Sequence, residues 1–178
     1  VSLFEFPARR LFEWALLLPL AMPAYVLAYA TTDFLQYSGP LQTLLRAWTG
    51  AEGALWPDVR SLPGAIVLFT LALYPYVYLL TRTALLERGL HLMEAARLLG
   101  AGLGRRVRRV ALPLARPALA AGVALALMET LADYGVGAYF GLTTFTTGIY
   151  KAWLSMGDRV AAAQLATVLL AVVALLLW

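Results

Sequence analysis

Two carboxylates lie inside a stretch of the chain that is otherwise apolar. Glu129 and Asp133 fall in the second half of a mostly Ala, Leu and Val run from about Pro117 to Val136. Ionisable groups within such a run are costly and usually face a bundle interior or a watery cavity. Because they are four residues apart, both would share one helix face and attract a cation. With Tyr134 they form a candidate translocation path, the alternative being that both reach interfacial water or bond neighbouring helices.

Other residue types exclude several kinds of chemistry. The chain has no Cys, so disulfides and thiolate metal sites are excluded, and its one His, His91, lies in an amphipathic segment where no metal role is expected. A Walker A loop needs Gly-Lys before Ser or Thr, whereas the single lysine stands between Tyr150 and Ala152. We therefore predict no cofactor in this chain; if ATP drives it, another chain binds the nucleotide.

Membrane spans are the elements that must hold these residues. Of the 178 residues, 62% are apolar and 13% are charged, and mean hydropathy is +0.76, against roughly 45–50% and 25% in ordinary soluble domains. Helical crossings need about 20 apolar residues, which predicts spans at about 11–31, 62–82, 114–136 and 160–178. The uncharged, Gly- and Thr-rich residues 134–150 are predicted to be re-entrant or interfacial. The predicted fold class is all-α, a polytopic transmembrane helical bundle.

Arginine placement predicts the orientation of these spans, because cytoplasmic loops collect Lys and Arg. Residues 82–116 hold eight arginines against Glu87 and Glu94, and the other loops hold few. We expect the N-terminus and the 82–116 loop to be cytoplasmic. Arg9 and Arg10 before an apolar run resemble a twin-arginine signal, but three further spans follow rather than an exported domain, which indicates a retained helix. The chain starts with Val and stops on an apolar run, so we expect a fragment of a longer protein.

The basic loop contains a spaced pattern. Its seven marked residues are Glu94, Ala95, Ala96, Gly100, Val110, Leu112 and Pro113. Apolar residues recur at helical spacing from Leu92 to Leu99, which indicates a short amphipathic helix. Glycines at 100, 102 and 104 would end it, and Leu-Pro would restart a helix at its first turn. Such a projecting helix can dock in a groove of a soluble partner, or it can bind lipid alone.

This spacing resembles the EAA loop, E-A-A-x3-G-x9-I-x-L-P, of permease subunits of binding-protein-dependent (type I) ABC importers, with Val110 in place of Ile. The resemblance implies a MetI-like permease fold in the bacterial inner membrane. It also implies that 87–113 is a coupling loop, in which the seven marked residues pass ATP-driven closure from the ATPase to the spans.

The same resemblance implies a set of partners. They are an ABC ATPase subunit dimer, a periplasmic substrate-binding protein, a second permease half or homologous subunit and the lipid bilayer, with no nucleic acid. The chain would then be a transport subunit and not an enzyme, working by alternating access.

A second stretch, residues 131–135 with 140–141 and 144–153, is similar to Fe(III)-type permeases of this superfamily. That resemblance implies ferric iron as the substrate. Ferric ion is hard and prefers oxygen ligands. Carboxylates and phenolates are available at Glu129, Asp133, Tyr134, Tyr139 and Tyr150. Tyrosines at membrane borders also serve as interfacial anchors, so the metal ligands stay unassigned.

Several alternatives remain open at the level of sequence. Within the importer class, the substrate could be sulfate, a polyamine, phosphonate or molybdate. Outside that class, the chain could be an ion channel or a membrane-embedded enzyme. An enzyme would need a polar catalytic cluster at membrane depth, where only Glu129 and Asp133 are available, and a channel would not need Glu94 or a docking loop.

Overall fold

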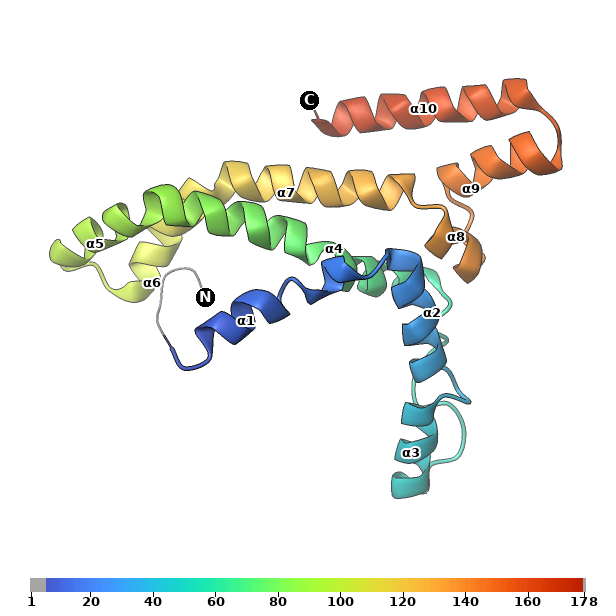
Figure 1. The fold of residues 1–178 in the computed structure, drawn as a ribbon, viewed down its shortest axis with the longest axis horizontal. Helices are drawn as coiled ribbons and strands as arrows, with labels where there is room; N and C mark the ends of the chain where they lie inside the picture. The colour runs from blue at the N-terminus through green and yellow to red at the C-terminus, as the bar shows by residue number, and fades with distance from the viewer. Residues whose placement is uncertain (1–5, 178) are drawn as a thin grey trace. The chain divides into compact units, whose positions relative to one another are not determined.

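Every regular element that the structure describes is a helix. The computed structural model describes residues 6–177, and Figure 1 shows helices and connecting segments within them. The all-α prediction is confirmed. Contacts divide the chain into two units, Val1–Ala21 with Leu73–Leu127 and Met22–Ala72 with Met128–Trp178.

Within residues 6–177, three helices are long and apolar enough to cross a membrane. They are Leu62–Glu87, Leu103–Ala132 and Arg159–Leu177. The first and last overlap the predicted spans 62–82 and 160–178, although Trp178 lies outside the described residues. The middle helix begins well before residue 114 and ends before 136.

The predicted span 11–31 is not one continuous helix. It comprises α1 (Arg9–Ala15), a 3-10 turn (Leu18–Ala21) and, after a break, α2 (Ala24–Leu35). Pro23 stands at the break with φ −56° and ψ 143°, an extended conformation, and proline removes a helical N–H donor. Arg9–Ala21 and Ala24–Thr49, taken together, are long and apolar enough for a fourth span.

Two of the long helices cross closely within the first unit. They are α4 (Leu62–Ala84) and α7 (Leu112–Ala132), which each contribute residues to both units. Gly122 of α7 is buried, and a Cβ built there would lie 2.6 Å from Cα of Val77 on α4. Such small residues let membrane helices approach, and their association depends on close van der Waals contact.

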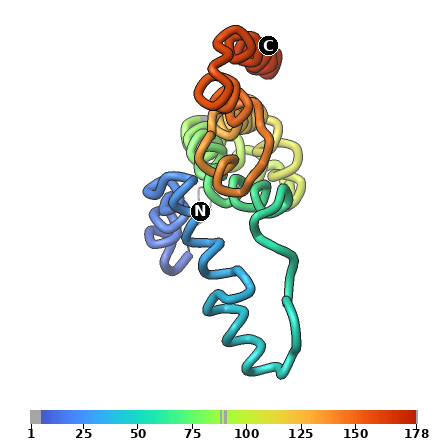
Figure 2. Tube along the Cα trace, turned by 90° about the vertical axis from the view of Figure 1, so that its right-hand side faces the viewer, coloured from blue at the N-terminus to red at the C-terminus, as the bar shows by residue number. Residues whose placement is uncertain are grey.

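The second unit contains a hairpin-like excursion between two of the helices. After α2 come α3 (Pro40–Thr49) and a non-helical return that runs back beside it (Figure 2). Gln42 of α3 is buried; its Nε2 donates to the Leu35 carbonyl at 3.0 Å and its Oε1 accepts from the Leu55 amide at 3.2 Å. Trp56 Nε1 also donates to the Leu35 carbonyl, at 2.8 Å. These bonds pair the polar groups that the excursion buries.

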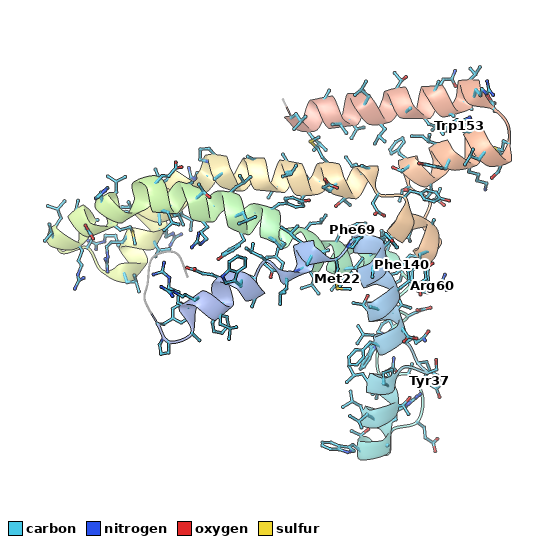
Figure 3. All side chains as sticks on the ribbon, in the orientation of Figure 1. Met22, Tyr37, Arg60, Phe69, Phe140 and Trp153 are labelled. Atoms are coloured by element: carbon cyan, nitrogen blue, oxygen red, sulfur yellow. The ribbon has the colours of Figure 1, made fainter. Side chains whose placement is uncertain are left out.

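The core of the second unit lies where α2, the start of α4 and α8 (Gly135–Phe140) meet. Its buried members are Ala28, Ala65, Leu68, Val136 and Phe140. Phe69 packs against this cluster, and Figure 3 shows it near Phe140.

Residues 134–150, predicted to be re-entrant or interfacial, form α8 and α9 (Phe145–Tyr150). Gly141, with φ +70°, ends α8. The Thr144 hydroxyl accepts from the Thr147 amide and begins α9, in a reciprocal capping arrangement. A π turn (Lys151–Ser155) then leads to α10 (Arg159–Leu177).

Candidate functional site

The outgoing half of the predicted coupling loop is a continuation of α4. The helix runs past Ala84 through a π turn (Leu85–Gly89) into α5 (Leu90–Leu98). It ends at Gly100, whose φ is +77° and whose amide donates to the Arg97 carbonyl at 3.0 Å. A Cβ at Gly100 would meet nothing within 4 Å. The left-handed backbone, rather than space, therefore favours glycine at this cap.

Most of the apolar side chains at the end of α5 are not covered by other residues of the first unit. Met93 is buried, whereas Leu98 is 89% exposed and Leu99 is 87% exposed. The predicted stripe included Leu92 and Leu99, yet both point outward, and Glu94 is exposed beside them. The amphipathic helix is thus confirmed as a helix, but the side that packs inward is the one with Met93.

The helix in the returning half of the loop begins at Leu103, earlier than the predicted restart at Leu112. Helix α6 (Leu103–Arg106) and a π turn (Val107–Ala111) run directly into α7, so no helix restarts at Leu112. Pro113 lacks an N–H, and its ring crowds the carbonyl four residues back. A wider π turn, closed by the Leu112 amide on the Val107 carbonyl, comes directly before this proline.

The loop pattern is brought together in space, because α5 packs against α6 and against the π turn. Ala96 and Val110 are half-buried. The exposed members of the pattern are Glu94, Ala95, Gly100, Leu112 and Pro113. The motif therefore presents a surface of mixed apolar and acidic character at the turn, flanked by exposed arginines at positions 105, 108 and 109.

In the second unit, the two path carboxylates have different environments. Asp133 follows the end of α7, and its Oδ1 accepts from the Val136 amide at 2.7 Å, which caps the start of α8. Glu129 is exposed in the last turn of α7. Among the described residues, no three His, Cys, Asp or Glu side chains gather as a metal site would require.

The aromatic candidates fall into two separate groups. The Tyr134 and Tyr150 rings stack with centroids 4.4 Å apart. Tyr139 instead packs on Tyr29, at 3.9 Å between centroids. The Arg60 guanidinium lies 4.8 Å from the Tyr139 ring centroid and donates Nε to the Tyr139 carbonyl at 3.1 Å. Tyr134 and Tyr150 are thus brought together, whereas Tyr139 packs against other residues.

Sequence reasoning did not place Lys151 on the path, although it directly follows Tyr150. Together with Tyr134, Tyr150 and Ser155, it lines a hollow of about 180 Å³. The ammonium, phenol and hydroxyl groups are hydrogen-bond donors. Lys151 therefore adds a positive charge to the lining of this hollow, opposite in sign to the carboxylate pair.

The sequence is similar to known proteins over nearly its whole length. Residues 2–178 match the family described as binding-protein-dependent transport system inner membrane component. The chain is 29% identical over 180 residues to the molybdenum transport system permease protein ModB of Escherichia coli, covering 97% of this chain and 76% of that protein. It is also 29% identical over 180 residues to the sulfate transport system permease protein CysT of Salmonella typhimurium, covering 98% and 63%. It thus spans less than two thirds of that sulfate permease.

These relatives support the permease prediction and match the alternative substrates better than iron. They are permease subunits and not enzymes, and neither is named for iron, so the ferric-iron prediction is not supported. The stretch that suggested iron is rich in residues that cap and turn short helices, such as Asp133, Thr144 and Thr147. Such residues report on backbone geometry and carry little information about cargo. Because the family match extends over nearly the whole sequence, the chain belongs to the inner membrane components of binding-protein-dependent transport systems, as a permease subunit of a type I ABC importer.

Proposed function

We propose that this chain is part of the permease of an inner-membrane importer for a tetrahedral oxyanion of the sulfate or molybdate type. A periplasmic binding protein would deliver the anion, and a second permease half or homologous subunit would complete the path. An ABC ATPase dimer on the cytoplasmic side would drive alternating access through residues 87–113.

The exposed end of α5 is the observation that carries the coupling role. Leu98 and Leu99 are almost fully exposed beside Glu94 and the Gly100 turn. Burying a leucine side chain contributes about 1.5–3 kcal/mol. Two leucines therefore offer about 3–6 kcal/mol toward docking, before the costs of association are subtracted.

A double substitution at this turn tests the coupling role. Glu94→Lys reverses the charge, and Gly100→Asp strains a backbone with φ +77°. We expect the double variant to reach the membrane but to lose co-purification with the ATPase subunit.

The matched control is Glu52→Lys with Gly53→Asp in the loop before α4. Gly53 also has a positive φ, +95°, and open space around it. We expect this control to retain the ATPase. Undiminished ATPase recovery with the Glu94 and Gly100 variant would reject the coupling role and favour a loop that contacts lipid only.

The side chains around Lys151 support a negatively charged substrate. They lie in the loop before α10, which the predicted topology places outside the cytoplasm. Sulfate and molybdate ions are oxygen-rich anions that accept hydrogen bonds. The hollow at Lys151 offers donors from Tyr134, Tyr150 and Ser155. We therefore place Lys151 and Tyr134 on the path. Asp133 is instead bonded to the Val136 amide, and Glu129 does not line the hollow.

Uptake in cells that lack their own permeases tests the substrate. We expect radiolabelled sulfate or molybdate to accumulate with the cognate binding protein and ATPase, and ferric iron not to accumulate. Lys151→Gln should lower oxyanion uptake severalfold while assembly is unchanged, and Arg159→Gln should behave as wild type. Restored iron uptake, or full oxyanion uptake with Lys151→Gln, would contradict these assignments.

A further inference from the structure

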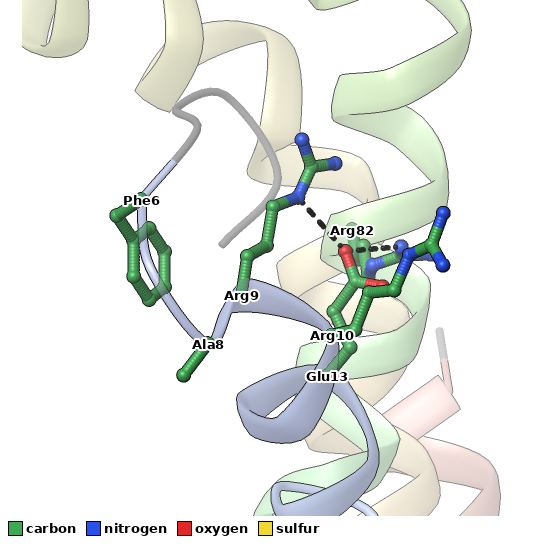
Figure 4. Close-up of a pocket in the computed structure, with 6 residues that line it drawn as sticks. All are labelled: Phe6, Ala8, Arg9, Arg10, Glu13 and Arg82. Atoms are coloured by element: carbon green, nitrogen blue, oxygen red, sulfur yellow. Dashed lines mark hydrogen bonds and ion pairs between the residues drawn. The ribbon is translucent and has the colours of Figure 1, made fainter.

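A pocket of about 650 Å³ lies in the first unit, next to α1 and the end of α4 (Figure 4). The residues that line it are Phe6, Ala8, Arg9, Arg10, Glu13 and Arg82. Neither the loop pattern nor the proposed path uses any of them.

The charge of this pocket is only partly balanced. Glu13 Oε1 accepts from Arg9 Nε and from Arg82 Nη2, both at 3.0 Å. Arg10 makes no ion pair with any residue in the described part of the chain, and Arg82 Nε is buried without a hydrogen-bond partner there. Three guanidinium groups against one carboxylate leave a formal charge of +2.

The position of the pocket along the chain points to a membrane border. Arg9 and Arg10 precede the first apolar segment, and Arg82 stands near the end of the apolar run of α4. Both helices therefore reach the same side of the bilayer there, the cytoplasmic side by the arginine count. Phe6, 38% exposed, adds an apolar group to the lining. Lipid headgroups carry phosphates at this depth.

We propose that this pocket binds the phosphate of an anionic membrane lipid. Arg10 and Arg82 would donate to phosphate oxygens, which guanidinium forks bind in a bidentate manner, and Phe6 would contact the glycerol and acyl region. Basic pockets between helices on the cytoplasmic side are sites of this kind. The bound lipid would also tie α1 to α4 at the place where Glu13 already joins them. The proposal rests on the membrane placement of the proposed function but not on its substrate.

Lipid retention by the assembled transporter tests the proposal. The transporter is placed in nanodiscs of phosphatidylcholine, with or without phosphatidylglycerol, and retained phosphatidylglycerol is measured by native mass spectrometry. Arg10→Gln removes a charge that makes no ion pair within the described residues, and Arg82→Lys keeps the charge near Glu13 but loses the planar fork. We expect Arg10→Gln to lower affinity on the order of fivefold, and Arg82→Lys to lower it less. Arg116→Gln, an exposed arginine of α7 outside the pocket, should retain lipid as wild type does.

Two results would overturn the proposal. One is phosphatidylglycerol retention by Arg10→Gln and Arg82→Lys equal to that of wild type and Arg116→Gln. The other is displacement of the retained lipid by inorganic phosphate, which would identify a site for free anions. Lipid retention is measured independently of oxyanion uptake and of ATPase co-purification. A failure of the proposed function in those two assays can therefore be distinguished from a failure of the lipid proposal.

Discussion

Replacing Gly122 by alanine should force α4 and α7 apart within the first unit. The added Cβ would lie 2.6 Å from Val77 Cα, 3.2 Å from its amide nitrogen and 3.3 Å from its Cβ. Nonbonded carbon atoms prefer about 3.5–4.0 Å. The two helices must therefore separate by roughly 1 Å, which forfeits about a quarter to a half of the dispersion energy of each contact affected.

The cost follows from overpacking of a close helix crossing. Inserting a methyl group into a well-packed region costs about 1–3 kcal/mol, and we expect Gly122→Ala to destabilise the protein by that amount. Because the nearest atoms belong to the backbone, adding Val77→Ala should not rescue the variant. Gly104→Ala is the matched control, since a Cβ there meets nothing within 4 Å in α6.

Thermal unfolding of the assembled transporter in nanodiscs, followed by tryptophan fluorescence, measures the effect. We expect a lower Tm for Gly122→Ala, a still lower one for Gly122→Leu, and an unchanged or higher Tm for Gly104→Ala. A Gly122→Ala protein as stable as the control would refute the close crossing. Rescue by Val77→Ala would show that the obstacle is a side chain.

Two further predictions concern hydrogen bonds of the second unit. Asp133→Ala should cost about 1 kcal/mol because it removes the cap on the Val136 amide, whereas Asp133→Asn keeps an acceptor and should retain the Tm; an equal loss in both variants would mean that the charge, not the cap, matters. Gln42→Met should cost about 1–3 kcal/mol, because it leaves the Leu55 amide without its bond while the Leu35 carbonyl keeps the one from Trp56. Thr43→Val, at an exposed neighbour, is its control, and proteolysis of the return after α3 would report the loosening.

The positions of the long helices could be predicted because an apolar run of about 20 residues has few other uses. The turn at Gly100 could also be predicted, since a glycine after an amphipathic segment is a common helix end. The break at Pro23 was not predicted, because the apolar run from 11 to 31 by itself indicates one continuous helix. The π turn before Pro113 was not foreseeable, because it depends on how one turn accommodates a missing donor.

The sequence predicted where the candidate site residues lie along the helices but not what they contact. Periodicity identifies an apolar face on α5 but not what covers it, and the structure turns Met93 inward while Leu98 and Leu99 stay exposed. The carboxylate spacing suggested a cation path, but spacing cannot show that Asp133 is already used by the Val136 amide. Lys151 was overlooked because its significance comes from the hollow that Tyr134 and Tyr150 form around it.

The continuity of the helices bears on how a coupling loop would act, given the proposed function. One helical path runs from Leu62 to Leu98 and a second from Leu103 to Ala132, so the Gly100 turn is covalently continuous with two membrane helices. A force on the tip of α5 would therefore be transmitted along α4 and α7 without a flexible linker. Each path contains one π turn close to the tip, Leu85–Gly89 and Val107–Ala111, where the regular hydrogen-bond ladder is interrupted. Because the ladder is interrupted there, we expect any bending of the loop to occur at those two turns rather than at the crossing of Gly122 and Val77.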